Sequence, residues 1–213
     1  MFQLSRSLQP DIYPISLCHQ LCFAGSFSNR LGLSFTAKTF EWFLSAENRF
    51  LYHVLFNYEV VGYIGGFYPQ YPGDGSTSGM MRYAMKEAIA GIAKKPWLLF
   101  SKELFPFYPL IFKNIYHKIF KIHAGNKVSG VPGVNSFQQK VGLVVIGVHP
   151  NYRGSGIFEK LMQQFEKEAN ERHISSLVLS VKKDNDRAVH AYTKNGWMIS
   201  KENGKAIEMY KTI

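Results

Sequence analysis

The sequence predicts an α/β (α+β) protein with a mixed central sheet flanked by helices, because the period of its apolar residues changes along the chain. Apolar residues recur at helical spacing over residues 10–23 and 36–46, which predicts two helices joined by a loop. Residues 49–68 then alternate in the manner of an antiparallel hairpin that turns at residues 57–59. From residue 140 onward, strand-length apolar runs alternate with helical ones.

The C-terminal part is predicted element by element. Residues 140–150 form a nearly all-apolar run of strand length, and a glycine turn leads from it into a helix at about residues 155–172. Residues 175–181 predict a second buried strand. A short helix then ends at Gly196, and a last hairpin turns at Asn203 and Gly204.

Between these parts, residues 70–139 differ in character from the rest of the chain. The segment opens with a loop rich in Pro, Gly and Ser, continues through a helical stretch at residues 78–95, and then becomes aromatic and basic. It holds nine Lys or Arg residues against three acidic ones, which is more than half of the chain's net charge of +10. We interpret it as a mainly helical insertion within one domain that spans residues 1–213.

Composition excludes several classes of protein. An apolar content of 46% in 213 residues is ample for a buried core. Cys18 and Cys22 are the two cysteines, too few for a disulfide framework, and their spacing puts both on one face of a helix, with His19 off that face. We interpret them as buried apolar side chains and expect no metal site.

The basic charge favours anionic partners at encounter, but its scatter along the chain argues against nucleic acid binding. No secretory signal is visible, so we expect a cytoplasmic protein. Residues 97–120 are the most apolar long segment, but charged residues and prolines interrupt them, so they do not predict a membrane span. Peripheral contact with the inner face of a membrane remains open.

The stretch "VHPNYRGSGIFEKLM" carries the first chemical signal. A buried strand that turns through Gly154 and Gly156 into a helix presents unpaired N–H groups at the positive end of the helix dipole. Glycine there allows close approach of an anion, and Arg153 adds a cation. The alternative is an ordinary strand-to-helix turn. The turn lacks the Lys and Ser/Thr of a nucleoside triphosphate loop, and no acidic residue follows at dinucleotide spacing.

The second signal is "VKKDNDRAVHAYTKNGW", about thirty residues on. Together the two stretches resemble the acyl-CoA binding half of the GNAT acyltransferase superfamily, closely over about residues 140–200. The resemblance implies a GNAT-like sheet, with the insertion between its third and fourth strands. The superfamily's signature begins at Arg153 and places Phe158 where a Gly or Ala is usual. The Phe158 ring either turns toward the core or narrows the cofactor channel.

The resemblance also implies roles for individual residues. The pyrophosphate of the cofactor would lie on the backbone amides of Arg153, Gly154, Ser155, Gly156, Ile157 and Phe158. The pantetheine arm would run along Leu143 to Val148, with Val145, Ile146, Gly147 and Val148 closest to it, and their N–H groups would stabilise charge on the thioester carbonyl. Asn185 would contact the arm.

Tyr192 falls on the position of the tyrosine that protonates the leaving thiolate. The alternative is a helix tyrosine that packs on the sheet. The acceptor amine must also lose a proton, and candidates for the base are His53, Glu59, Glu41 or a chain of water molecules. His149 precedes the proline of the turn and is interpreted as positional.

The sequence therefore predicts an N-acyltransferase with acetyl-CoA, or another acyl-CoA, as co-substrate and no metal. The acceptor would be a primary amine of a small molecule or an amino sugar, and lipid-linked sugars are included. The alternative function is a non-catalytic acyl-CoA-binding or membrane-surface module, which fits Phe158, the absence of a carboxylate on the central strand and the aromatic insertion.

Overall fold

A computed structural model describes residues 1–70, 76–101 and 139–213 of the chain. Within them, one seven-stranded sheet has the order β1-β2-β3-β4-β5-β7-β6. Its neighbouring strands are antiparallel except β4 and β5, which are parallel. The mixed sheet confirms the predicted fold class. The strands are β1 (Gln3–Arg6), β2 (Arg49–Phe56), β3 (Glu59–Phe67), β4 (Val141–Val148), β5 (Ser176–Lys182), β6 (Met198–Asn203) and β7 (Ala206–Thr212).

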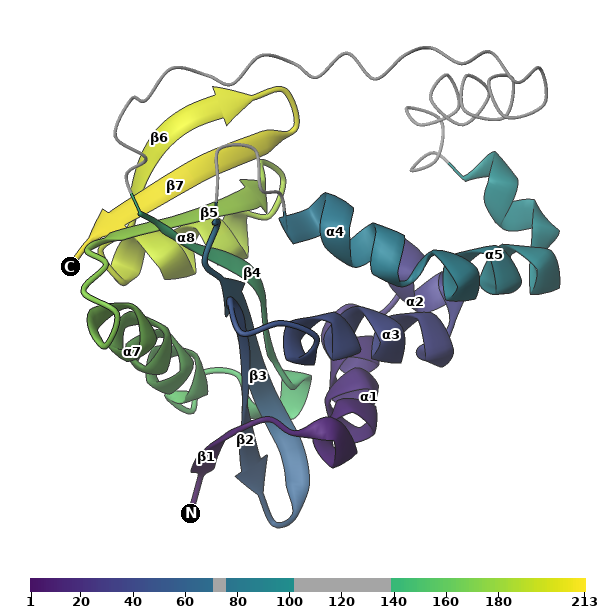
Figure 1. Cartoon of the computed structure of the whole chain (residues 1–213), viewed down its shortest axis with the longest axis horizontal. Coiled ribbons are helices and arrows are strands. Elements are labelled where there is room, and N and C mark those ends of the chain that lie inside the picture. Colours follow the sequence, from purple (N-terminus) through teal and green to yellow (C-terminus); the bar gives the residue numbers. More distant parts are fainter. Residues whose placement is uncertain (71–75, 102–138) are drawn as a thin grey trace.

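Helices cover both faces of the sheet, as Figure 1 shows for α7 on one side of β2–β4 and α1 and α3 on the other. The described helices are α1 (Ile12–Cys22), α2 (Phe27–Leu31), α3 (Leu33–Leu44), α4 (Ser76–Tyr83), α5 (Met85–Lys94), α7 (Ile157–Asn170) and α8 (Asp186–Lys194). Short 3-10 turns lie at Gln9–Asp11, Pro96–Phe100 and Pro150–Tyr152. The layered arrangement buries an apolar cluster on each face of the sheet.

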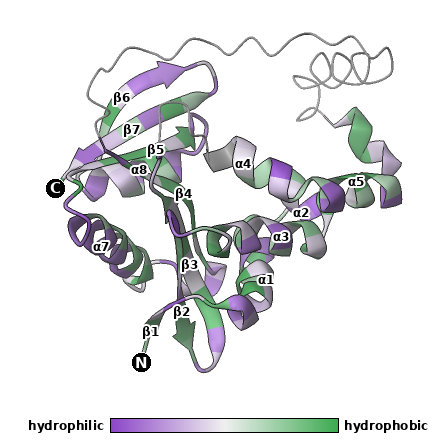
Figure 2. Ribbon diagram, in the orientation of Figure 1, coloured by the Kyte–Doolittle hydropathy of each residue, from purple (hydrophilic) through white to green (hydrophobic). Residues whose placement is uncertain are grey.

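The first cluster lies between the sheet and α7 and contains the predicted stripe of that helix: Ile157, Leu161, Met162, Phe165 and Ala169. The second lies between the sheet and helices α1 and α3, and includes Tyr63 of β3. Figure 2 shows the same division by hydropathy, with β3 and β4 largely hydrophobic and α7 hydrophilic on the side away from the sheet. β4 therefore lies between two cores, which explains its nearly continuous apolar sequence.

The N-terminal part differs from expectation in two places. The sheet begins with β1, a four-residue edge strand that has too few residues to show a period. The loop expected between the first two helices contains α2, because the Ser26 side chain accepts a hydrogen bond from Asn29 N–H at 3.3 Å and caps it. Gly32, at a φ of 107°, separates α2 from α3.

The positions of the two hairpin turns agree with expectation to within one residue. Asn57 and Tyr58 have φ of 49° and 66° and form the two-residue turn between β2 and β3. The last hairpin turns one residue later than expected, because Asn203 still pairs with Ala206. Residues 70–139 lie between β3 and β4, as predicted, and their described part contains α4 and α5. Most of the aromatic stretch at residues 97–120 lies outside the described residues.

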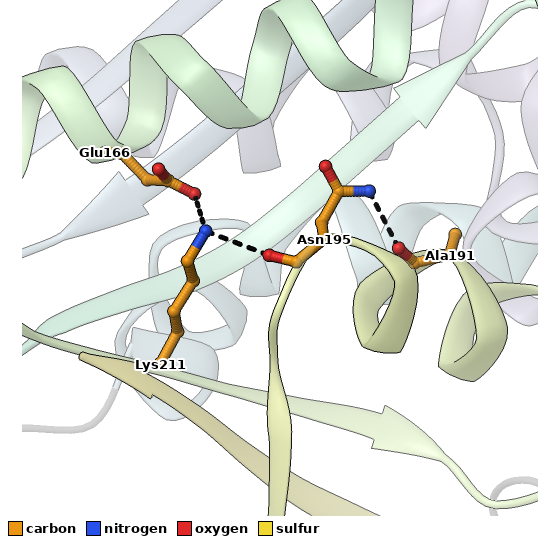
Figure 3. A network of polar contacts seen from close by, with 4 residues as sticks. All are labelled: Glu166, Ala191, Asn195 and Lys211. Atoms are coloured by element: carbon orange, nitrogen blue, oxygen red, sulfur yellow. Dashed lines mark hydrogen bonds and ion pairs between the residues drawn. The ribbon is translucent and has the colours of Figure 1, made fainter. Parts of the chain in front are cut away.

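A polar network fixes α8 against α7 and β7 (Figure 3). The Lys211 ammonium donates to Glu166 Oε1 at 2.5 Å and to the backbone oxygen of Asn195 at 2.9 Å. The Asn195 side chain in turn donates to the Ala191 carbonyl at 2.9 Å. α8 carries Tyr192, so this network holds the candidate acid in place relative to α7.

Candidate active site

The parallel strands β4 and β5 diverge near the middle of the sheet. They pair only over Val141–Leu143 and residues 177–179, so the rest of β4 has no partner on that side among the described residues. A bulge at Val144 interrupts the pairing of β4 with β3 at the same level, because Gly65 pairs with Val145 and Gly66 with Leu143. The parted strands leave one edge of β4 available to an extended ligand.

The hydrogen bonding between β4 and β3 indicates which N–H groups of β4 point toward the edge that β5 leaves unpaired. His149 N–H donates to Val61 of β3 at 2.9 Å. Because successive residues of a strand direct their polar groups to opposite sides, the N–H groups of Val148 and Ile146 point toward the edge that β5 leaves unpaired. All four predicted strand residues lie opposite residues of β3, but only Val148 and Ile146 are placed to donate their N–H groups to a ligand, while those of Gly147 and Val145 point toward β3.

The glycine turn follows directly and begins α7. Gly154 and Gly156 have φ of 80° and 83°, in the left-handed region that glycine adopts without strain, and a Cβ on either would meet no atom within 4 Å. The first hydrogen bond of the helix runs from Lys160 N–H to the Gly156 carbonyl at 3.0 Å. The N–H groups of Ile157 and Phe158 therefore precede the helical hydrogen bonds, at its positive end.

Not every predicted amide is equally available. Arg153 N–H and Ser155 N–H each make a long hydrogen bond of 3.4 Å within the turn, to Pro150 and Tyr152. The N–H groups of Gly154, Gly156, Ile157 and Phe158 have no hydrogen-bond acceptor among the residues described. An anion of phosphate size at this turn would meet a group of donors together with open space in front of the glycines.

Positive charge gathers beside the turn. The Arg153 guanidinium donates to the backbone oxygen of Cys22 at 3.3 Å, which ties the turn to the end of α1. A hydrogen bond from Cys18 lowers the pKa of the Cys22 thiol, and the positive charges of Arg153 and Arg187 lower it further. Arg187, in the first turn of α8, is a cation near the site that the sequence alone did not indicate.

Phe158 and Tyr192 lie together on the α7 side of the sheet. Phe158 is partly buried against the first core cluster, and its ring lies 5.8 Å from that of Tyr192. Tyr192 is 7% exposed, and burial raises the pKa of its hydroxyl above the usual value, so the group is protonated at neutral pH. The hydroxyl has no hydrogen-bond partner in the described parts of the chain.

Asn185 occupies the N-terminal cap of α8. Its Oδ1 accepts a hydrogen bond from Ala188 N–H at 3.3 Å, which uses the acceptor side of the amide. The Nδ2 group has no partner within the described ranges and remains a donor.

Two of the predicted base candidates are held in structural roles. His53 is 2% exposed, with its Nδ1 2.9 Å from Ser7 Oγ and its Nε2 3.9 Å from Asp11 Oδ1. Glu41 accepts a hydrogen bond from the Lys38 ammonium at 2.6 Å on the outside of α3.

The third candidate, Glu59, and the positional His149 are also poorly suited to act as the base. Glu59 is exposed at the beginning of β3, beside the hairpin turn. The His149 Nδ1 accepts from Asn151 N–H at 3.2 Å and caps the 3-10 turn, in keeping with the positional role expected from the sequence.

A different histidine lies beside the splayed part of β4. His19, in the last turn of α1, has its Nδ1 2.7 Å from the Tyr63 hydroxyl, and Tyr63 pairs with Gly147. Burial, and then the nearby Cys22 and Cys18 thiols, raise the pKa of the Tyr63 hydroxyl, so Tyr63 lies beside both His19 and the thiol face of α1. The sequence carried no signal for this contact, because 44 residues separate its two side chains.

Further observations concern the cysteines, membrane-spanning helices and a hollow away from the predicted site residues. The Cys18 and Cys22 sulfurs are 3.9 Å apart on one face of α1, as expected, and no group of three metal-ligating side chains occurs in the described residues. None of the helices described is long and apolar enough to cross a membrane. A hollow of about 640 Å³ lies at the opposite end of the sheet, between Ser7 and Arg49, and none of the predicted site residues lines it.

A strand that leaves its parallel neighbour and turns through glycines into a helix is the architecture of an acyl-CoA-binding transferase. A family model described as "Acetyltransferase (GNAT) family" matches residues 19–197. The chain therefore belongs to the GNAT acetyltransferase family, as the resemblance implied. A comparison with curated protein sequences finds no match.

Solved structures with the same fold include the following three proteins. The PaiA N-acetyltransferase of Thermoplasma acidophilum, in complex with coenzyme A, is 12% identical, with a TM-score of 0.57 over 100% of this chain and 99% of that one. The ribosomal-protein-S18-alanine N-acetyltransferase of Escherichia coli is 15% identical, with a TM-score of 0.56 over 100% and 94%. NAA60 of Arabidopsis thaliana, in complex with acetyl-CoA, is 10% identical, with a TM-score of 0.58 over 100% and 99%. At these identities the likeness concerns the fold.

Proposed function

We propose that this chain is an acetyl-CoA dependent N-acyltransferase that moves an acetyl group to a primary amine of a small molecule or an amino sugar. The observation that carries the proposal is the continuous path from the unpaired edge of β4 to the free N–H groups at the start of α7. The path offers donors for a pantetheine arm at one end and for a diphosphate at the other. The coenzyme A complex of the Thermoplasma protein and the acetyl-CoA complex of the Arabidopsis protein support this choice of co-substrate.

The reaction would proceed by direct attack on the thioester. The amine nitrogen forms a bond to the carbonyl carbon, and the electron pair of the C=O bond moves to oxygen, where the Ile146 N–H would stabilise the charge. Collapse of this intermediate breaks the C–S bond. The thiolate leaves with the proton of the Tyr192 hydroxyl, and the amine nitrogen gives up a proton to a base.

The experiment is an acetyl transfer assay over a panel of primary amines that includes amino sugars, polyamines and amino acids. Release of free thiol would report turnover, and mass spectrometry would identify the acetylated product. Thiol release that depends on one class of amine supports the proposal and identifies the acceptor. A protein that binds acetyl-CoA and acetylates none of the panel would contradict it.

A second candidate is a membrane-surface or non-catalytic acyl-CoA-binding module, and one observation favours surface contact. Trp97 and Phe100 are 65% and 80% exposed, and Lys94 and Lys95 lie shortly before them in the sequence. Co-sedimentation with anionic liposomes, together with no transfer to any amine, would favour this candidate. A cytoplasmic location is the expectation under either function.

A further inference from the structure

Acetyl transfer to an amine needs a base, and the side chains that the sequence offered for this role are bonded elsewhere or lie away from β4. His19 is different, because it lies in the last turn of α1 and that turn contacts the glycine turn through Arg153. The side chain is partly exposed, while its ring packs against Phe23 and Phe40 at centroid distances of 4.8 and 5.4 Å. The imidazole is therefore both fixed in orientation and accessible.

Tyr63 connects this imidazole to the splayed strand. It is fully buried, and its hydroxyl lies directly over Gly147, where an added Cβ would come within 2.4 Å of the Tyr63 oxygen. Gly147 follows Ile146, whose N–H points to the unpaired edge of β4. His19 thus lies beside the segment of β4 on which the thioester carbonyl would lie.

The hydrogen bond between His19 and Tyr63 can place the imidazole proton on Nδ1. Burial raises the pKa of the Tyr63 hydroxyl, which therefore stays protonated at neutral pH, and its oxygen can still accept a hydrogen bond. We assign the His19 proton to Nδ1, which then donates to the Tyr63 oxygen at 2.7 Å. This tautomer, assigned from the network, leaves the lone pair of His19 on Nε2.

Nε2 has no hydrogen-bond partner among the residues that the structure describes. Burial lowers the pKa of His19 to about 4, so the imidazole is neutral at pH 7 and its lone pair is free. A base this weak cannot take a proton from a resting ammonium group. It is sufficient once the C–N bond forms, because positive charge then develops on the nitrogen and makes its N–H acidic.

Acid and base would lie on opposite faces of β4. Tyr192 and Phe158 belong to the α7 side, which the first core cluster fills. Tyr63 belongs to the cluster on the α1 side. An amine that approaches from the α1 side would meet His19, while the departing sulfur would lie toward Tyr192.

We propose that His19 is the general base of the acetyl transfer and that Tyr63 is the residue that positions its ring. This inference rests on the proposed function. The neutral amine attacks the carbonyl carbon, Nε2 takes one proton from the nitrogen as the C–N bond forms, and the bond to sulfur then breaks. The thiolate takes the Tyr192 proton, His19 later releases its proton to solvent and Tyr192 regains one from solvent, so that acetyl-CoA and amine become amide and free coenzyme A.

The test compares His19→Asn with the wild type, using the best amine of the panel. Asparagine keeps an N–H donor for the Tyr63 oxygen and has no basic nitrogen. We expect kcat to fall by about 10²-fold or more, with the Kd for acetyl-CoA and the melting temperature nearly unchanged. In His19→Ala, added imidazole should restore part of the lost rate, which it would not do if His19 only maintained structure.

Tyr63→Phe provides the second variant. It removes the acceptor of His19 Nδ1–H but keeps the ring, so kcat should fall less than in His19→Asn and imidazole should not restore it. The inference would be overturned, and the proposed function left standing, if His19→Asn had the same kcat as the wild type. The same conclusion would follow if the loss of kcat accompanied weaker acetyl-CoA binding and imidazole did not restore the rate of His19→Ala. A wild type that binds acetyl-CoA and acetylates no amine would overturn the proposed function and this inference with it.

Discussion

The ring of Phe158 lies against that of Tyr192, with their centroids 5.8 Å apart and their planes inclined at 55°. Phe158 stands where the family signature has a small residue, and the structure directs it toward the core side of α7. The contact therefore relates an unusual residue of the glycine turn to the candidate acid. It also means that Phe158 supports Tyr192 through packing.

Phe158→Ala should remove that support. A Phe→Ala change at a fully buried position lowers the free energy of unfolding by about 3–5 kcal/mol. Because Phe158 is only partly buried, we expect a smaller loss. The kcat should fall as Tyr192 becomes less well placed, while acetyl-CoA binding persists, because the backbone amide remains. Thermal denaturation and calorimetric titration would measure the two effects. Improved acetyl-CoA affinity in Phe158→Ala would show instead that the ring narrows the cofactor channel.

Tyr192→Phe tests the acid itself. The variant keeps the ring contacts with Phe158 and Trp197 and removes only the hydroxyl. If the hydroxyl protonates the leaving thiolate, kcat should fall by about 10²–10⁴-fold with the Kd for acetyl-CoA nearly unchanged. Steady-state kinetics with thiol detection would measure this, and an unchanged kcat would assign Tyr192 a packing role only.

Gly156→Ala should weaken cofactor binding. Alanine at a φ of 83° costs about 1–2 kcal/mol of stability and places a methyl group in the space before the free N–H groups. Gly204→Ala is the matched control, because Gly204 also has a positive φ, of 57°, and lies in the β6–β7 turn. Both variants should melt earlier than wild type, but only Gly156→Ala should bind acetyl-CoA more weakly. Equal binding by the two variants would be evidence against an anion site at this turn.

Stability should depend on pH through His19. Burial lowers its pKa from 6.5 to about 4 in the folded state, so the unfolded chain binds the proton more readily. The contribution to stability is therefore present above pH 6.5 and is lost as the pH falls toward 4, up to about 3 kcal/mol in all. Chemical denaturation at several pH values should show a smaller acid-side loss in His19→Asn. Burial lowers the pKa of His53 as well, which leaves a residual loss in that variant.

The sequence revealed those parts of the molecule that depend on local pattern. The strand-turn-helix around Gly154 and Gly156, the buried stripe of α7 and the hairpin at Asn57 each follow from the spacing of apolar residues and glycines. The residues that produce each of these features lie within about a dozen positions of one another in the sequence. They were therefore predictable without knowledge of the tertiary structure.

The contacts that complete the site have no such local cause. His19 meets Tyr63 across 44 residues, and Arg153 meets the Cys22 carbonyl across 131 residues. Such pairs depend on how α1 packs against β3 and β4. Sequence reasoning therefore predicted a cofactor path along β4 and the turn from local pattern and resemblance, but it had no means of finding the contact between His19 and Tyr63.

The central claim is that the main-chain N–H groups at the start of α7 hold a diphosphate. Calorimetric titration of the wild type with acetyl-CoA and with S-acetyl-N-acetylcysteamine, which carries the same thioester but no diphosphate, tests it most directly. Loss of two or more charge-assisted hydrogen bonds should make the truncated thioester bind about 10²-fold more weakly or worse. Equal affinity for the two thioesters would contradict the account.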